Sequence, residues 1–291
     1  MFGDMISMTK FSLVLCTINN RKDIPKFIES LSCNIHEKKF EVELIVIDQN
    51  TLSIADLFSD IAERVTLKYF KVDFKGLSRA RNYALKHVSG DIVCFPDDDC
   101  IYTQSLLKNI YELFAYNNHV DFISVNTKDP IAGEKALVKL PKSKTNISFK
   151  SKNCVSFTLF FRREVINAVG RFDQNMGVGA GTNYGAGEES DFVVRALSLG
   201  FKGLYYPDYY VLHPAKESHP VFDDIIKNRM LSYGGGYGYF LQKNFYRQGR
   251  FLSIKNIFGV FLRLIKSLHS KVEFLKSFYF TIGFLKGFFK K

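Results

Sequence analysis

The chain has 291 residues, a net charge of +11 and a hydrophobic content of 46%, which suits one large domain with an appendage. Five scattered cysteines without a CxxC pair argue against a disulfide framework or a structural zinc site, and they fit a reducing cytoplasm. Residues 1–10 lack the apolar core of a signal peptide, and no run reaches the roughly 18 apolar residues of a membrane span.

Apolar runs and helical periodicity alternate along the chain up to about residue 212. Continuous apolar runs predict strands, and apolar residues spaced three and four apart predict helices. Strands are expected at 11–18, 43–48, 67–72, 91–95, 120–125, 155–161, 203–206 and 209–212. Helices are expected at 24–31, 54–61, 77–87, 106–114, 163–169 and 188–199. This alternation predicts an α/β fold with a mainly parallel central sheet flanked by helices.

Two stretches lack such a pattern. Residues 128–153 are rich in Lys, Ser and Pro, and we expect either an insertion on the surface or a loop near the site. Residues 170–187 carry many glycines and are expected to form a long loop on the ligand side.

Three consecutive aspartates, Asp97, Asp98 and Asp99, follow the strand predicted at 91–95. Pro96 ends that strand because proline has no N–H to donate. The carboxylates repel one another, and a divalent cation carrying phosphate oxygens would offset the repulsion; oxygen ligands suit magnesium or manganese. Ligands also bind at the carboxyl ends of strands in open α/β sheets. The alternative is a solvated acidic turn.

Two further polar residues lie at predicted strand ends. Asp48 ends the strand at 43–48, where an acid can accept hydrogen bonds from a base edge or a ribose. The alternative is a turn that initiates a helix. His213 follows the last predicted strand and is a candidate third metal ligand, although a lone histidine is more often structural.

A basic helix start and an acidic helix start complete the candidates. Gly76 precedes the helix at 77–87, which carries Arg79 and Arg81. A helix start attracts anions, and an arginine can meet a diphosphate. Residues two apart do not share a helix face, so one arginine is expected to face the ligand and the other to support the sheet. The alternative is a solvated basic helix start.

The acidic start holds Glu188, Glu189 and Asp191, directly after the glycine-rich stretch. One carboxylate can serve as a general base that deprotonates an acceptor hydroxyl. The alternative is that these acids only complement the helix dipole.

Five segments together resemble the inverting family 2 glycosyltransferases of the GT-A type, especially bacterial enzymes that build surface polysaccharides. These segments are FSLVLCTINNR, ELIVIDQN, GLSRARNYAL, CFPDDDC and GAGEESDFVVRALSLGF, and the resemblance covers roughly 11–214. It implies a GT-A nucleotide-sugar-binding fold. It also implies an enzyme that uses Mn²⁺ or Mg²⁺ to transfer a sugar from a nucleotide-sugar donor.

The resemblance assigns roles to matching residues. Asp97 would contact the donor's ribose or sugar, with Asp98 beside it, and Asp99 would ligate the metal that bridges the diphosphate. The base and ribose would be held by Thr17, Asn20, Arg21 and Asp48. Gly76 and Arg81 would lie near the donor phosphates.

The segment GEESD matches the family's catalytic acid motif, which usually reads Glu-Asp. Here it reads Glu-Glu, so Glu189 is the expected base, and Glu188 and Asp191 stay open as alternatives. The implied acceptor is a polyprenyl-diphosphate-linked glycan of capsule, O-antigen or exopolysaccharide synthesis, with a UDP-hexose as the default donor. A catalytically silent protein that binds nucleotide sugar or membrane is the alternative.

The last forty residues are rich in aromatics and cations, with Glu273 as the single acid of 251–291. Basic amphipathic helices of this kind suit an anionic membrane surface, here the cytoplasmic face of the inner membrane, as a peripheral protein. The alternative is packing on the domain, and nucleic-acid binding is not expected. We expect a catalytic domain at 1–220, a linker with a Gly/Tyr-rich bend at 221–250, and basic amphipathic helices at 251–291.

Overall fold

The structure, a computed structural model, describes residues 8–19, 22–36, 39–133, 140–150, 154–215 and 221–290. Its strands join into one sheet in the order β3-β2-β1-β4-β8-β6-β9-β5, and β7 pairs with β9 beside this path. The strands are β1 (Thr9–Thr17), β2 (Phe40–Asp48), β3 (Thr66–Lys71), β4 (Ile92–Cys94), β5 (Ile101–Tyr102), β6 (Phe122–Lys128), β7 (Thr145–Ile147), β8 (Leu159–Arg162) and β9 (Gly203–Leu212). The α-helices are α1 (Ile24–Asn34), α2 (Ser59–Ala62), α3 (Leu77–Ala84), α4 (Leu106–Tyr116), α5 (Arg163–Val169), α6 (Glu188–Ser198), α7 (Asp224–Lys243), α8 (Arg250–Lys266) and α9 (Lys271–Phe288).

The sheet has a parallel half and a mixed half. In the first half β2 pairs in parallel with both β1 and β3, and β4 pairs in parallel with β1, so the carboxyl ends of these strands share one edge. In the second half β8 runs antiparallel to β4 and β6, and β9 runs parallel to β6 but antiparallel to β5 and β7. The expected parallel character therefore holds only for the first half.

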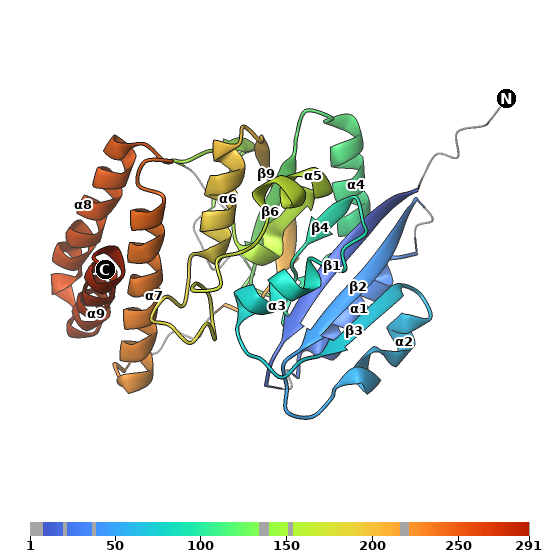
Figure 1. Ribbon diagram of the computed structural model, residues 1–291, viewed down its shortest axis with the longest axis horizontal. Helices are drawn as coiled ribbons and strands as arrows, with labels where there is room; N and C mark the ends of the chain where they lie inside the picture. The colour runs from blue at the N-terminus through green and yellow to red at the C-terminus, as the bar shows by residue number, and fades with distance from the viewer. Residues whose placement is uncertain are drawn as a thin grey trace.

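Helices cover both faces of the sheet (Figure 1). On one face Leu31 of α1 and Ile110 of α4 belong to a buried cluster with the apolar side chains of β1 and β2. On the other face Ala80 of α3, Val165 of α5 and Phe192 of α6 belong to a second cluster. Strands buried on both faces explain why the first runs of the sequence are continuously apolar.

Three details differ from the expectations. The unpatterned stretch 128–153 contributes β7, which pairs with β9, and its residues 134–139 and 151–153 lie outside the described ones. The two strands expected at 203–206 and 209–212 are one strand, whose register with β6 shifts between Val125 and Asn126. The helix expected at 54–61 is a 3₁₀ turn, Ala55–Phe58, followed by α2.

The prediction of a Gly/Tyr-rich bend, at residues 232–238 of the expected linker, is wrong. These residues lie inside the continuous helix α7. Their glycines have a packing role instead. A Cβ at Gly234 would lie 2.0 Å from the Phe280 carbonyl oxygen of α9, and one at Gly287 of α9 would lie 2.0 Å from the Gly235 oxygen. Only hydrogen fits at these positions, so α7 and α9 pack backbone against backbone.

The helices α7, α8 and α9 stand together at one end of the molecule, beside α6 (Figure 1). A third apolar cluster joins these three helices to α6. It includes Val194 of α6, Phe240 of α7, Val260 of α8 and Phe284 of α9. The C-terminal helices therefore pack on the domain in part, as the second reading of the tail expected. No helix among the described residues is long and apolar enough to cross a membrane.

Candidate active site

Asp97, Asp99 and His213 meet at the edge where β4 ends. The Nε2 atom of His213 lies 3.0 Å from Oδ1 of Asp99 and 3.8 Å from Oδ2 of Asp97. One ligand atom from each of the three residues lies within 4.8 Å of the other two. Burial raises the pKa of Asp97, and Asp99 and Glu188 add to this rise, while Arg81 and His213 oppose it. The imidazole of His213 thus joins two carboxylates that are more than a hundred residues earlier in the sequence.

The imidazole of His213 is held in a defined orientation. Its ring stacks on Phe157 at 4.5 Å, and Nδ1 lies 2.8 Å from the carbonyl oxygen of Pro214. With Nδ1–H donating to that carbonyl, the neutral ring presents the Nε2 lone pair to the carboxylates. Burial lowers the pKa of His213, but the hydrogen bond to Asp99 and the charges of Asp99 and Asp97 outweigh burial and raise it.

This donor set fits a divalent cation. The oriented imidazole nitrogen and the two carboxylates are ligands that manganese accepts, and magnesium accepts the carboxylates. A cation would also relieve the repulsion between the carboxylates, a task that His213 performs in part when it is protonated. Asp99, Asp97 and His213 are thus the residues that would hold a metal.

Arg81 is a buried cation beside this cluster. Its guanidinium lies 3.7 Å from Asp97 and 3.3 Å from Glu188, and it also lies against the rings of Phe95 and Phe172, at 5.6 and 5.4 Å from their centroids. Arg79, which we also nominated, is exposed and stacks on Phe74 at 4.3 Å. Residues two apart on α3 diverge as expected, and Arg81 is the one that faces the acidic cluster.

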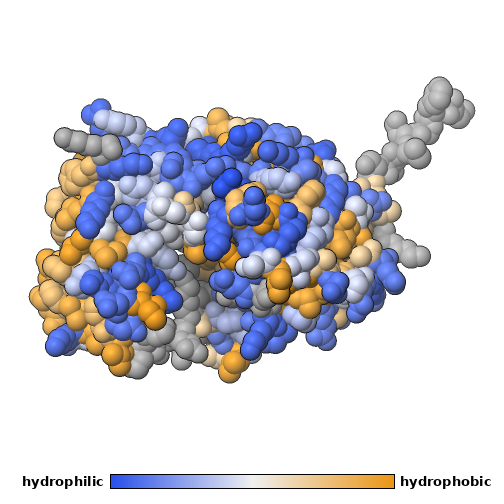
Figure 2. Space-filling view, turned by 60° about the horizontal axis from the view of Figure 1, so that its bottom comes forward, coloured by the Kyte–Doolittle hydropathy of each residue, from blue (hydrophilic) through white to orange (hydrophobic). Residues whose placement is uncertain are grey.

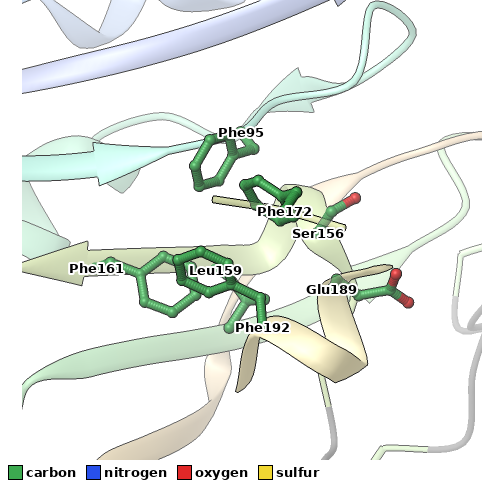
Figure 3. A pocket seen from close by; sticks show the side chains of 7 residues that line it. All are labelled: Phe95, Ser156, Leu159, Phe161, Phe172, Glu189 and Phe192. Carbon is green, nitrogen blue, oxygen red and sulfur yellow. The ribbon is translucent and has the colours of Figure 1, made fainter. Parts of the chain in front are cut away.

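Glu189 lies at the start of α6, at the rim of an aromatic cluster. The cluster is lined by Phe95, Ser156, Leu159, Phe161, Phe172 and Phe192. Figure 3 shows the Glu189 carboxylate directed away from the phenylalanine rings of this cluster. Burial and the neighbouring Glu188 raise the pKa of Glu189 to about 8, against a weaker opposing effect of Arg81. A carboxylate with such a pKa is basic enough to take a proton near neutral pH.

The other two acids of this helix start have different surroundings. Glu188 is buried and pairs with Arg81. Asp191 is 0% exposed, and it accepts hydrogen bonds from Arg195 at 2.9 Å, Lys243 at 3.1 Å and Asn244 at 2.9 Å. These bonds tie α6 to α7 and leave Asp191 closed to a substrate hydroxyl. Of the three acids, Glu189 is the one for which the described residues show no ion pair.

The nominated nucleotide-binding residues lie at the ends of β1 and β2. Thr17 donates to Asp98 at 2.7 Å, so this pair joins β1 to the acidic turn. Asp48 is buried and accepts from the backbone N–H and side chain of Asn50 and from the hydroxyl of Tyr69. Asn20 and Arg21 lie outside the described residues.

A hollow lies beside these strand ends. It is lined by Ile18, Asn19, Gln49, Asn50, Thr51, Leu52 and Lys75. The side-chain oxygen of Gln49 is buried at its wall and has no hydrogen-bond partner within the part of the chain that the structure describes. A buried acceptor without a partner is costly, and a ligand donor would satisfy it. Sequence reasoning passed over Gln49 because a glutamine after a strand carries no distinctive signal.

The glycine-rich segment 170–187 forms no helix or strand and packs on α3. Ser78 donates to the Met176 carbonyl at 2.6 Å, and the Leu77 N–H donates to Val178 at 2.9 Å. Gly76 has a φ of +115°, and a Cβ there would lie 3.1 Å from the Gly179 oxygen. Gly76 is therefore required for close contact between two loops, which hold the start of α3 against the segment that leads into α6.

Comparison with known proteins identifies the family of the chain. The family model "Glycosyl transferase family 2" matches residues 12–173, which is more than half of the chain. The chain is 25% identical over 179 residues to "Minor teichoic acid biosynthesis protein GgaA" of Bacillus subtilis, covering 57% of this chain and 40% of GgaA. It is 24% identical over 227 residues to "Glycosyltransferase AglE" of Haloferax volcanii, covering 75% of this chain and 70% of AglE.

Solved structures share the fold. A structure of Staphylococcus aureus TarS 1-349 has a TM-score of 0.61 at 18% identity, covering 96% of this chain and 72% of that one. TarS 1-349 in complex with UDP-GlcNAc has a TM-score of 0.57 at 19% identity, covering 81% and 72%. The chain spans 40% of the length of GgaA. The chain belongs to glycosyl transferase family 2, and it has a GT-A-like fold, a mixed α/β sheet flanked by helices.

Proposed function

We propose that this chain is a metal-dependent inverting glycosyltransferase that moves a sugar from a nucleotide-sugar donor, by default a UDP-hexose. The observation that carries the proposal is the meeting of Asp97, Asp99 and His213 beside Arg81 and Glu189. A set of side chains that could ligate a cation, an arginine and a carboxylate with a raised pKa lie together at one sheet edge, which is the combination that the proposed reaction requires. The UDP-GlcNAc complex of TarS, a protein of the same fold, supports the choice of donor.

The donor's diphosphate would lie at the acidic turn. A bound Mn²⁺ or Mg²⁺, held by Asp99, Asp97 and His213, would supply positive charge to the leaving diphosphate. Arg81 supplies a second positive charge, and its burial against Phe95 and Phe172 restricts movement of the guanidinium. The nucleoside would extend over the ends of β1 and β2, where Gln49 offers an acceptor to a base N–H.

Glu189 would act as the general base. The acceptor oxygen attacks the anomeric carbon while the bond from that carbon to the diphosphate oxygen breaks. The acceptor's proton passes to the Glu189 carboxylate, and the nucleoside diphosphate leaves with the bonding electron pair. A single displacement from the face opposite the leaving group inverts the anomeric configuration, through a transition state with oxocarbenium character.

The acceptor is proposed to be a polyprenyl-diphosphate-linked glycan of a capsule, O-antigen or exopolysaccharide, met at the cytoplasmic face of the inner membrane. The relatives support a cell-surface glycan, since GgaA is named for minor teichoic acid biosynthesis. A lipid-linked acceptor would require the enzyme to work at a membrane surface.

Binding and turnover test the proposal together. UDP with Mn²⁺ should raise the melting temperature more than UDP alone, because a ligand of the native state stabilises it. Asp99→Asn should remove the Mn²⁺-dependent part of the shift and the donor turnover, while the fold stays intact by circular dichroism. Equal shifts with and without Mn²⁺, or normal turnover in Asp99→Asn, would contradict the metal assignment.

A further inference from the structure

The outward side of α8 is a continuous apolar stripe, which we call the α8 outer face. Its members recur at helical spacing: Phe251, Ile254, Phe258, Phe261, Leu262 and Ile265. Phe251 is 82% exposed, Phe258 69% and Ile265 62%. Figure 2 shows hydrophobic groups gathered at the end of the molecule that α8 and α9 form. Contiguous apolar surface of this kind marks a binding site rather than ordinary scattered exposure.

The inward side of α8 is mostly apolar too, and it packs on the domain, so α8 carries apolar side chains on two sides. Its inward positions are Ser253, Ile257, Val260 and Leu264, with the Ser253 hydroxyl donating to the Phe245 carbonyl at 2.8 Å. The large aromatic residues face outward, where the domain's own core gains nothing from them. Something outside the described residues must therefore account for this face.

Charge indicates what covers the face. Lys255 and Lys266 are exposed and lie about three turns apart along one edge of the stripe. Glu273 is the single acid of 251–291, and it pairs with Lys276 at 2.8 Å. A second copy of this chain would bring like charges together at the same face, which is unfavourable. An anionic lipid surface would instead receive the cations at its head groups and the aromatics just below them.

We propose that the α8 outer face binds the surface of an anionic lipid bilayer, with α8 lying in the plane of that surface. The helix is about 25 Å long at 1.5 Å per residue, so it presents the stripe to one leaflet along its whole length. This inference names the partner surface and rests on the proposed function for the location of the acceptor. Its test involves no sugar transfer, so the two can fail separately.

Co-sedimentation of the full chain with lipid vesicles tests the inference. Vesicles of phosphatidylcholine containing phosphatidylglycerol should retain the protein, and added salt should weaken retention. The triple variant Phe251→Ser, Phe258→Ser, Ile265→Ser should bind at least roughly tenfold more weakly, because three apolar groups no longer enter the lipid. Replacing Lys255 and Lys266 with Ala should weaken binding roughly fivefold per lysine on anionic vesicles.

A matched control removes exposed apolar side chains elsewhere: Tyr116→Ser, Ile131→Ser and Leu199→Ser. This control should bind vesicles as the unchanged chain does. Melting temperatures and the UDP–Mn²⁺ shift should be unaffected in all variants, which separates lost lipid binding from lost folding. Equal vesicle binding by the α8 variant and the control would overturn the inference. A second result would also overturn the inference: the unchanged chain does not bind vesicles but forms a dimer, and the α8 substitutions dissociate that dimer.

Discussion

The acidic edge of the sheet and the interface between α7 and α9 depend on opposite kinds of residue: charged side chains at the edge, and glycines at the interface. At the acidic edge, Asp97, Asp99, Arg81 and Glu189 act through the charge of their side chains. At the interface, Gly234, Gly238, Gly283 and Gly287 act through the absence of a side chain. We therefore expect the first region to be more sensitive to changes of charge than of shape, and the second to be sensitive to any added side-chain atom. Substitutions in the two regions should therefore separate catalysis from stability.

The largest expected effect is on catalysis. Glu189→Gln should lower kcat roughly 10²- to 10⁴-fold, because the base is lost, while the UDP–Mn²⁺ thermal shift stays. Glu164→Gln, on the exposed start of α5, is the matched control and should leave kcat unchanged. A fall in stability without a specific fall in kcat would assign Glu189 to structure instead.

The pH profile sharpens the same point. Glu189 must be deprotonated to accept a proton, and its pKa is raised from 4.5 to about 8. Donor turnover should therefore rise with pH, on a limb with an apparent pKa well above 4.5 and up to about 8. The limb should be absent from the residual rate of Glu189→Gln. A limb near the ordinary carboxyl pKa in the unchanged enzyme would contradict the role of burial.

On the other side of the comparison, Gly234→Ala should lower the free energy of unfolding by at least about 3 kcal/mol. Its Cβ would lie 2.0 Å from a backbone oxygen that cannot move independently of α9. Gly259→Ala is the control, since a Cβ on this α8 glycine meets nothing within 4 Å. That change should stabilise by up to about 1 kcal/mol through helix propensity, and urea unfolding measures both. Similar values for the two would refute backbone-to-backbone packing.

Glu43 is a charged residue that we expect to affect stability but not catalysis, because it lies in β2 away from the acidic edge. Burial would raise the pKa of Glu43, but hydrogen bonds from Lys68, Ser12 and Ser89 lower it to about 2. Because the folded pKa lies below the unfolded value near 4.5, the stabilisation is present above pH 4.5 and is lost as the pH falls towards 2. Glu43→Gln should lower the free energy of unfolding by up to about 3 kcal/mol at pH 7, and the difference should shrink at pH 3.

The smallest expected effect is at the hollow beside the ends of β1 and β2, where Gln49 lies. Gln49→Leu removes the unpartnered acceptor and should raise the KM for the donor by roughly tenfold, about 1 kcal/mol, with kcat unchanged. Thr51→Val, at another position of the same hollow, is the control. An unchanged KM in Gln49→Leu would remove this residue from the donor site.

Much of the site could be predicted because the carboxyl ends of parallel strands meet at one edge. That rule placed Asp48, Asp97 and Asp99 at one sheet edge without knowledge of any contact. Arg81 and Glu189 were candidates as residues of two charged helix starts, and the resemblance then singled them out from their neighbours. The partners of Asp191 could not be foreseen, since Lys243 and Asn244 follow it by more than fifty residues and come from α7. Orientation was equally hidden: only the stacking on Phe157 and the Pro214 carbonyl define which nitrogen of His213 faces the acids.

The glycines of α7 were the clearest failure of sequence reasoning. Ser232–Gly238 has the composition of a turn, and local propensity favours a bend there. Tertiary contact overrides propensity, because the same residues allow α9 to approach to backbone distance. Pairing Gly234 and Gly238 with Gly283 and Gly287 in the sequence, four apart in each helix, was the signal that could have revealed the interface.

One consequence of the α7 glycines reaches beyond stability. A Cβ on Gly235 would meet the Asn183 oxygen at 2.2 Å, and one on Gly236 would meet the Ala186 oxygen at 2.3 Å. The same helix thus touches α9 on one flank and, on the other, the peptide units just ahead of Glu189. Backbone meets backbone at these contacts, so we expect substitutions that displace the C-terminal helices to shift the position of Glu189 as well.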